Sequence, residues 1–365
     1  MSRTVLEVLG PSTGGIRRHV AALADGLPAL GWDATIAGPA GVMDGLTDGV
    51  VPIAVPAAMS TALRHPDRFS AAASSVGRLG RSHDVIHAHG LKAGLLAATI
   101  RGRPLVLTVH NIVLDVVAGS GAGLLRRVER GVVRRFDRVI CGSAEIATHL
   151  GDTVSAERLR IITPAALDPM PRRSRAEVRS DLGIVQDDQL VVAVARLHPQ
   201  KNLELLIRSF AVVAADHLRA RLVLIGEGPS RGELTRMIDA LGMSERVTLA
   251  GARPNPADEM AAADIVALSS TWEGVPIVAA EALQLGRPLV MTAVGSIGSA
   301  MALDGIGGTA VPVGDERSFT AALDHYLRDP GAAERAGVAG RALGEQYRAE
   351  HLVAAVAAVY EEVAG

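Results

Sequence analysis

The chain is poor in aromatic residues. Its 365 residues include four Phe, two Trp and three Tyr, together 2% of the sequence. The hydrophobic cores must therefore be built from Ala, Val, Leu and Ile, and a stacking platform for single-stranded nucleic acid is not expected. A formal net charge of −2 also argues against a protein that coats DNA. We expect no nucleic-acid partner.

Cysteines and long apolar runs are equally scarce. Cys141 is the single cysteine, which excludes an internal disulfide framework and fits a reducing compartment. No window reaches the ~20 apolar residues that a transmembrane helix needs. The first ten residues read as the start of a strand and not as a signal peptide. The expected location is the cytoplasm.

Several functional signatures are missing too. Without a Walker A sequence, P-loop chemistry is not predicted. Without Gly-x-Gly-x-x-Gly, an NAD-dependent dehydrogenase is the weakest of the alternatives. Without Asp-x-Asp, a magnesium-bridged diphosphate site is not predicted, and cationic side chains would have to neutralise a diphosphate.

Short apolar runs alternate with helical segments along the whole chain. This alternation predicts an α/β protein with parallel sheets covered on both faces. The runs form two series, separated by a proline-rich, charged linker, and predict two Rossmann-like domains with a cleft between them. The predicted strands are 4–9, 33–37, 50–55, 84–89, 104–110, 138–142 and 160–163, then 190–195, 221–225, 246–250, 264–268, 288–292 and 309–313.

The expected domain boundaries follow from the linker and from the last helix. Residues 1–168 form the first domain and residues 169–345 the second, because the linker around residues 168–173 separates the two series. The final helical segment runs from about residue 333 to 363 with a break near Gly344. It is too long for one compact position, so residues 346–365 are expected to cross back to the first domain.

The stretch from Ser269 to Gly286 predicts an anion site. It follows an apolar strand and restarts as a helix at Pro276, whose missing N–H costs nothing in the first turn. The free N–H groups of that turn favour a phosphate. Glu273 precedes the helix and Glu281 lies eight positions later, inside it. A nucleotide-diphosphate sugar would place one carboxylate at its ribose and the other at its sugar.

Two cations follow the first strand of the second series. Arg196 leaves the strand end, and Lys201, one of only two lysines, opens the next helix. Positive side chains at a helix N-terminus oppose the helix dipole unless an anion lies between them. Phosphate contact is the favoured interpretation, and a surface salt bridge is the alternative.

Glycine-rich loops and three histidines lie at other predicted strand ends. The loops at Gly14–Gly15 and Gly226–Gly228 allow close backbone approach to a ligand, although tight turns without a ligand have the same composition. His87, His89 and His110 could suggest zinc, but no Asp, Glu or Cys at typical spacing completes a ligand set, so no metal site is expected. His110 is better interpreted as lining the cleft.

A basic amphipathic helix is predicted over residues 123–138. Six arginines alternate at helical spacing with apolar residues: Arg126, Arg127, Arg130, Arg134, Arg135 and Arg138. An ordinary surface helix packed on the sheet has this pattern. The more specific hypothesis is that the Arg126–Arg138 region contacts anionic lipid or an anionic acceptor. Contact with lipid would place the protein peripherally on the inner face of the membrane.

Taken together, these motifs resemble the retaining GT-B glycosyltransferases of the family 4 type, over nearly the whole chain. The matching pieces, in order, are the Gly14-Gly15 loop, Thr108-Val109-His110-Asn111, Gly142-Ser143, residues 196–202, Gly226-Glu227-Gly228-Pro229, and the pair Glu273 and Glu281 in the family's E-x7-E spacing. Each piece is weak alone, but their order and spacing are specific.

The resemblance implies roles for individual residues. Arg196 and Lys201 would hold the donor diphosphate, Glu281 the ribose and Glu273 the transferred sugar. The backbone of Gly274, Val275, Pro276 and Ile277 would surround the sugar and the phosphate. His110 would lie beside the anomeric carbon, and Gly15 would let the first domain close on the diphosphate. The loops containing Gly226 and Arg253 would lie near the base.

The resemblance also implies the reaction. The family transfers a hexosyl-type sugar with retention and without a required metal, and no cofactor is expected beyond the nucleotide-sugar co-substrate. The donor base is open between UDP, GDP and ADP, and the acceptor between a lipid, a glycan and a secondary metabolite. A GT-B protein that binds a donor without transfer and a sugar-nucleotide epimerase are the alternatives.

Overall fold

The computed structural model describes residues 2–10, 15–39, 50–53, 66–110, 122–164, 168–273 and 276–365. The chain forms two compact units. The first unit combines Met1–Leu167 with Ala349–Gly365, and the second is Asp168–Arg348. The sequence predicted the two domain boundaries after residues 168 and 345.

The first unit contains a parallel sheet of seven strands in the order β3-β2-β1-β4-β5-β6-β7. The strands are β1 (Arg3–Leu9), β2 (Trp32–Gly38), β3 (Val50–Pro52), β4 (Val85–His89), β5 (Leu105–Val109), β6 (Arg138–Cys141) and β7 (Leu159–Ile161). Its helices are α1 (Gly15–Gly26), α3 (Pro66–Gly80), α4 (Gly90–Ala97), α6 (Ala122–Val133), α7 (Ala144–Leu150) and α16 (Ala349–Ala364).

The second unit contains a parallel sheet of six strands in the order β10-β9-β8-β11-β12-β13. The strands are β8 (Gln189–Val194), β9 (Ala220–Ile225), β10 (Val247–Gly251), β11 (Ile265–Leu268), β12 (Leu289–Thr292) and β13 (Gly308–Val311). Its helices are α8 (Arg175–Asp181), α9 (Leu203–Ala214), α10 (Arg231–Ala240), α11 (Ala257–Ala262), α12 (Ile277–Gln284), α13 (Gly295–Asp304), α14 (Glu316–Arg328) and α15 (Pro330–Glu345).

Both sheets have the strand order of the Rossmann fold. The order reverses between β1 and β4 in the first unit and between β8 and β11 in the second. Ligands of open α/β sheets bind outside the carboxyl ends of the strands at this reversal. All thirteen predicted strands are confirmed within a few residues at their ends.

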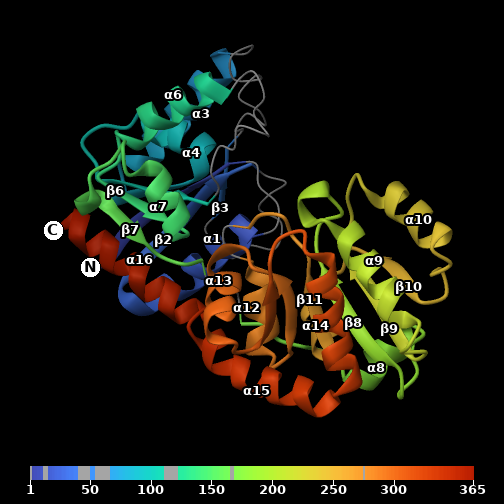
Figure 1. Ribbon diagram of the computed structural model, residues 1–365. Coiled ribbons are helices and arrows are strands. Elements are labelled where there is room, and N and C mark those ends of the chain that lie inside the picture. The colour runs from blue at the N-terminus through green and yellow to red at the C-terminus, as the bar shows by residue number, and fades with distance from the viewer. Residues whose placement is uncertain are drawn as a thin grey trace. The chain divides into compact units, whose positions relative to one another are not determined.

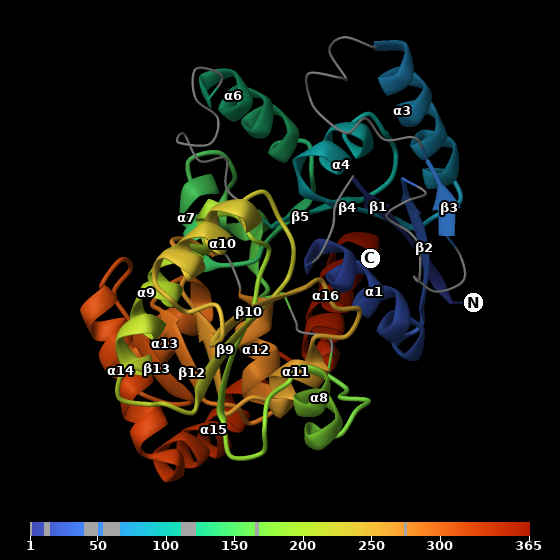
Figure 2. The same ribbon diagram turned by 90° about the vertical axis from the view of Figure 1, so that its right-hand side faces the viewer.

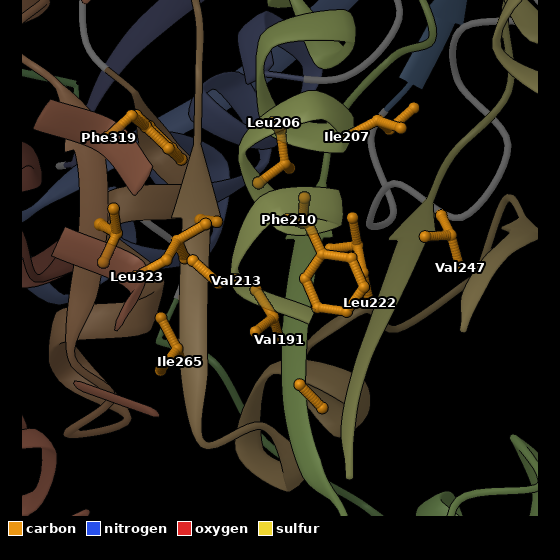
Figure 3. Close-up of a cluster of buried hydrophobic side chains, with 14 of the residues drawn as sticks. Val191, Leu206, Ile207, Phe210, Val213, Leu222, Val247, Ile265, Phe319 and Leu323 are labelled. Atoms are coloured by element: carbon orange, nitrogen blue, oxygen red, sulfur yellow. The ribbon is translucent and has the colours of Figure 1, made fainter. Parts of the chain in front are cut away.

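The strands are apolar because helices cover both of their faces. Figure 3 shows Phe210 of α9 against Val191 and Leu222 of the sheet, and Phe319 of α14 on the same side. Every residue of β11 and β12 is buried, which explains why these strands read as continuous apolar runs without alternation.

The last helix, α16, packs on the first unit. Figures 1 and 2 show it beside α1, and its apolar residues Leu352, Val356 and Tyr360 join a core with strand residues such as Val5. Arg138 of β6 donates to Glu362 over 2.8 Å. The break before α16 falls at residues 346–348, close to the predicted Gly344.

Glycines set the packing of α15 against α12. A Cβ atom at Gly340 would lie 2.7 Å from Leu283 Cδ2, and one at Gly344 would lie 2.7 Å from Gln284 N. These two glycines are four residues apart and therefore share one helix face. The helix approaches its neighbour more closely than any side chain would allow.

Three predicted helix boundaries were wrong. The apolar spacing after the Gly14–Gly15 loop predicts one helix from about residue 16 to residue 30. Helix α1 instead ends at Gly26 and continues as a 3-10 turn, Leu27–Leu30, because Pro28 interrupts the α-helical hydrogen bonds. Helix α6 ends at Val133, and Arg138, predicted to end it, begins β6. Pro276 is the N-cap of α12 and not its first residue.

Candidate functional site

In the second unit, the loops that follow β8 and β11 meet at the reversal of strand order. The main-chain N–H of Thr271 donates to the carbonyl oxygen of Gln200 over 2.9 Å. The side-chain amide of Gln200 donates to Trp272 O over 2.9 Å, and Ser269 Oγ donates to Lys201 O over 2.9 Å. These bonds hold the two loops together as one surface.

Lys201 and Glu273 meet on this surface. Lys201 Nζ contacts Glu273 Oε1, and Ser270 Oγ donates to the same oxygen over 2.6 Å. The Lys201 side chain is 21% exposed and that of Glu273 is 11% exposed, so the pair is largely shielded but open on one side. The structure therefore brings together two residues that the sequence assigned to the diphosphate and the sugar.

Helix α12 begins at Ile277, four residues after Glu273 in the sequence. Among the described residues, no side chain caps its N-terminus, and its first turn contains no acidic residue. The first amide groups of such a turn have no partner within the helix and favour an anion. Glu281 lies in the second turn and is 1% exposed. Gly274 and Val275, expected to surround the donor sugar, lie outside the described residues, whereas Pro276 and Ile277 begin the helix.

Arg196 and Gly226 lie on the neighbouring loops. Arg196 is exposed and makes no hydrogen bond or ion pair with any described residue. Gly226 has φ +143°, and a Cβ atom there would lie 1.9 Å from Ala195 O. The glycine is therefore required for backbone contact between the loops after β8 and β9, a structural reason that the sequence pattern did not reveal.

Arg253 is exposed in the loop after β10. Its Nε lies 3.4 Å from Oε1 of Glu259, which is buried at the start of α11. Burial raises the pKa of Glu259, although the charge of Arg253 opposes the shift. This ion pair fixes the position of Arg253 and gives it a structural role in addition to the one expected near the base.

In the first unit, a group of buried polar side chains lies at the other reversal of strand order. His110 directly follows β5 and is partly buried. Its Nε2 lies 3.3 Å from His89 Nδ1, and His89 Nε2 lies 2.6 Å from Glu7 Oε2. His89 and Glu7 belong to β4 and β1, which are adjacent strands. The candidate catalytic histidine is thus the outer member of a chain that ends on a buried carboxylate.

The same carboxylate is bound from the opposite direction. Tyr360 Oη of α16 donates to Glu7 Oε1 over 2.7 Å. His87 Nδ1 lies 2.6 Å from that hydroxyl, and His87 Nε2 lies 2.7 Å from Thr108 Oγ1. We call Glu7, His19, His87, His89, His110 and Tyr360 the histidine cluster. Its members come from β1, α1, β4, the end of β5 and α16.

Burial controls the ionisation of the histidine cluster. Burial alone would raise the pKa of Glu7, but His87 and His89 outweigh it and hold this pKa well below its usual range. Burial lowers the pKa of His89 to about 4, and the charge of His87 adds to the shift. Burial likewise holds the pKa of His110 and of His19 well below the usual range. These pKa directions leave Glu7 charged and the rings of His89, His110 and His19 neutral near pH 7.

The sequence missed Glu7, His19 and Tyr360. The argument against metal noted that no carboxylate accompanies the histidines, and the fold supplies one: Glu7 lies within metal-ligand distance of His87 and His89, and His19 within that distance of His89 and His110. Both nitrogens of His19 lack a hydrogen-bond partner among the described residues. A glutamate in the middle of the apolar run Val5–Leu9 was the available signal, because a buried charge needs partners.

Of the glycine loop, Gly15 begins α1, and Gly14 lies outside the described residues. The basic helix is less basic than expected. Arg134 and Arg135 follow α6 in a turn, and Arg138 pairs with Glu362, which leaves Arg127 and Arg130 as exposed arginines within the helix. Among the described helices, none is both long and apolar enough to span a membrane.

Comparison with solved structures identifies the class. The chain superposes on Anabaena HepE in complex with UDP and glucose with a TM-score of 0.83, at 21% identity, over 99% of this chain and 100% of that one. Sucrose-phosphate synthase from Thermosynechococcus elongatus gives the same TM-score at 20% identity, over 99% of each chain. The two units, each built on a parallel sheet, have the fold of the GT-B glycosyltransferases.

Sequence comparison identifies the family. The family model "Glycosyl transferases group 1" matches residues 174–343, and "Glycosyltransferase Family 4" matches residues 13–166. The D-inositol 3-phosphate glycosyltransferase of Mycolicibacterium smegmatis is 34% identical over 76% of this chain and 67% of its own length. The chain belongs to the group 1 glycosyl transferases.

A second relative leads to the same family. The Nocardia farcinica protein of the same name is 31% identical over 70% of this chain and 61% of its own length. The chain therefore spans about three fifths to two thirds of the length of these curated relatives.

Proposed function

We propose that the chain transfers a hexosyl group from a nucleotide-diphosphate sugar to an acceptor hydroxyl, with retention of configuration and without a metal ion. The observation that carries the proposal is the contact of Lys201 with Glu273 at the reversal of strand order, next to the uncapped N-terminus of α12. A cation and helix amides suit a diphosphate, and a shielded carboxylate suits sugar hydroxyls.

Each residue has a defined task in this proposal. Lys201, Arg196 and the amides of α12 stabilise the negative charge that develops on the leaving diphosphate, as preorganised donors do. Glu281 binds the ribose, and Glu273 binds the transferred sugar while Ser270 fixes one of its oxygens. The bond between the anomeric carbon and the phosphate oxygen breaks, the acceptor oxygen bonds to that carbon on the same face, and the acceptor proton passes to the leaving phosphate.

The relatives suggest which substrates to test first. HepE was crystallised with UDP, with UDP and glucose, and with UDP-glucose. We therefore propose a UDP-hexose before a GDP- or ADP-sugar. The curated relatives are named for D-inositol 3-phosphate, so a polyol phosphate precedes a lipid, a glycan or a secondary metabolite as acceptor.

The test is a matrix of donors and acceptors with purified protein in the presence of EDTA. We expect release of UDP and an acceptor product with the anomeric configuration of the donor, at a rate that added magnesium does not change. A donor converted without any acceptor would support an epimerase. Binding of a donor without turnover across the matrix would support a binding protein.

We also propose that α6 contacts an anionic surface, which would suit a lipid acceptor. The supporting observation is that Leu124, on the first turn of α6, is 63% exposed in the same helix as the exposed Arg127 and Arg130. An exposed apolar side chain next to cations is the arrangement that binds the surface of an anionic bilayer.

A further inference from the structure

We propose that Glu7 and His89 are positioning residues that fix the tautomer of His110, so that its Nε2 carries the proton and its Nδ1 presents a lone pair to a substrate hydroxyl. This assignment deepens the proposed function, because it concerns the acceptor-side histidine of the same reaction. The hydrogen bonds that run from Glu7 through His89 to His110, called the relay below, lie within one unit. They can be tested without measuring sugar transfer.

The direction of each hydrogen bond follows from the carboxylate. Glu7 accepts and cannot donate in its ionised form, so the proton between it and His89 resides on His89 Nε2. A neutral imidazole has a single N–H, and His89 Nδ1 must then accept. The partner of that nitrogen is His110 Nε2, 3.3 Å away, which therefore donates. Neutral His110 is left with Nδ1 as its acceptor atom.

Burial makes the relay stable. Glu7 and His89 have side-chain exposures of 0%, so water does not compete for their hydrogen bonds. The low pKa of Glu7 keeps it charged, and the low pKa values of His89 and His110 keep both rings neutral near pH 7. Among the described residues, none donates to His110 Nδ1, so this atom is available for a ligand.

The other members of the histidine cluster hold the carboxylate in place. Tyr360 donates to Glu7 Oε1, which reserves Oε2 for His89. The Tyr360 oxygen in turn accepts from His87 Nδ1, whose ring bonds to Thr108. The ring of His19 lies edge-on to His89 and to His110, with centroids 5.3 and 4.9 Å apart, and confines both rings by packing. A metal ion held by His19, His89 and His110, or by Glu7, His87 and His89, would replace a hydrogen bond of His89.

The isosteric variant Glu7→Gln should reverse the donor and acceptor roles along these hydrogen bonds. With Tyr360 still donating to the amide oxygen, the amide nitrogen faces His89 Nε2 and must donate to it. His89 then carries its proton on Nδ1 and donates to His110 Nε2, which moves the His110 proton to Nδ1. A histidine held in the wrong tautomer can no longer accept a hydrogen bond from the substrate hydroxyl and orient it for proton transfer to the leaving phosphate, even where its position is retained.

The experiment is long-range proton–nitrogen NMR of protein labelled at histidine nitrogens. In the unmodified protein we expect His110 as the Nε2–H tautomer, and in Glu7→Gln we expect that tautomer to be lost. Tyr360→Phe retains the carboxylate and should keep the original tautomer. Glu129→Gln is the matched control, because Glu129 is a second buried glutamate of the first unit that contacts a histidine, His149, over 3.0 Å.

Kinetics provide the second readout. Glu7→Gln should lower kcat at least about tenfold, because the acceptor hydroxyl loses its orientation, and leave the affinity for UDP unchanged, since the side chains proposed to bind the diphosphate and the ribose belong to the second unit. Glu129→Gln should change neither. An Nδ1–H tautomer in the unmodified protein, an unchanged tautomer in Glu7→Gln, or one equivalent of bound zinc after purification would each overturn the relay. A confirmed tautomer switch in a protein that transfers no sugar would leave the relay standing and contradict the proposed function instead.

Discussion

Lys201 and Glu273 are 72 residues apart in sequence, and the Lys201 ammonium group contacts the Glu273 carboxylate where the loops after β8 and β11 meet. In the absence of ligand each of the two charges stabilises the other, because a shielded charge without a partner would destabilise the fold. When a diphosphate binds, Lys201 can bridge it to Glu273. The contact therefore links the phosphate and sugar halves of the proposed donor site.

Glu273→Gln should separate sugar transfer from nucleotide binding. The variant keeps the size of the side chain and one acceptor oxygen but loses the charge that faces Lys201. We expect the transfer rate to fall at least about 100-fold, while the Kd for UDP, measured by calorimetry, changes little. Glu316→Gln is the control, since Glu316 forms an exposed ion pair with Arg208 in the same unit. Loss of activity in both variants would point to instability and count against the assignment of Glu273.

Two glycine substitutions should change the stability of the first unit in opposite directions. A Cβ atom at Gly26 would lie 2.7 Å from Val353 of α16, so Gly26→Ala should destabilise this unit by about 1–3 kcal/mol. A Cβ atom at Gly77 would meet nothing within 4 Å in helix α3, so Gly77→Ala should stabilise by up to about 1 kcal/mol.

The measurement is urea unfolding in a Trp272→Phe background, where Trp32, buried in the first unit and bonded to Glu361, is the remaining tryptophan. Equal stability of the two glycine variants would show that α16 does not pack on α1 as described.

The first unit should lose stability as the pH falls from about 6.5 to about 4. The pKa of His89 is lowered to about 4 in the folded chain, so the unfolded state binds more protons across this window and unfolding becomes easier. A shift of that size corresponds to about 3 kcal/mol for His89, and His19 and His110 add to it in the same direction.

The measurement is the unfolding free energy at several pH values, with Trp32 fluorescence as the probe. The slope should decrease in His89→Phe, which removes one titrating group. A stability that is independent of pH between 4 and 6.5 would show that these rings are solvated or charged in the folded protein.

Charge reversal on α6 tests the proposed membrane contact. Arg127→Glu combined with Arg130→Glu should reduce co-flotation with phosphatidylserine vesicles at least about tenfold, since each basic residue near an anionic surface contributes about 1 kcal/mol. Arg335→Glu is the control on the second unit, where the arginine side chain is 73% exposed. Equal flotation of both proteins, or none by the unmodified protein, would rule out α6 as the contact.

The sequence predicted the strands because both faces of each are covered. Runs such as Ile265–Leu268 have no polar alternation to obscure them, and the glycine and proline signals between them mark the loops. Helix ends were less well predicted at α6, because the apolar spacing continues through Phe136 although the helix stops at Val133. Local periodicity does not record where the backbone must turn into the next strand.

The candidate site was predictable on the donor side for a local reason. Glu273 and Glu281 lie on one strand-loop-helix unit, and Lys201 follows the adjacent strand, so strand order alone brings them to one edge. The histidine cluster was not predictable in the same way. Glu7 and Tyr360 are 353 residues apart, and their contact depends on α16 packing on the first sheet. No spacing rule within a single sequence encodes that approach.

The most direct test of the account is the titration of UDP into the unmodified protein and into Lys201→Ala, with Arg208→Ala as the control for a lost ion pair. Removing a charge-assisted contact to phosphate should raise the Kd at least about tenfold. We expect saturable UDP binding that Lys201→Ala weakens by this factor and Arg208→Ala leaves unchanged. Equal UDP affinity in the unmodified protein and in Lys201→Ala would contradict the assignment of the donor site.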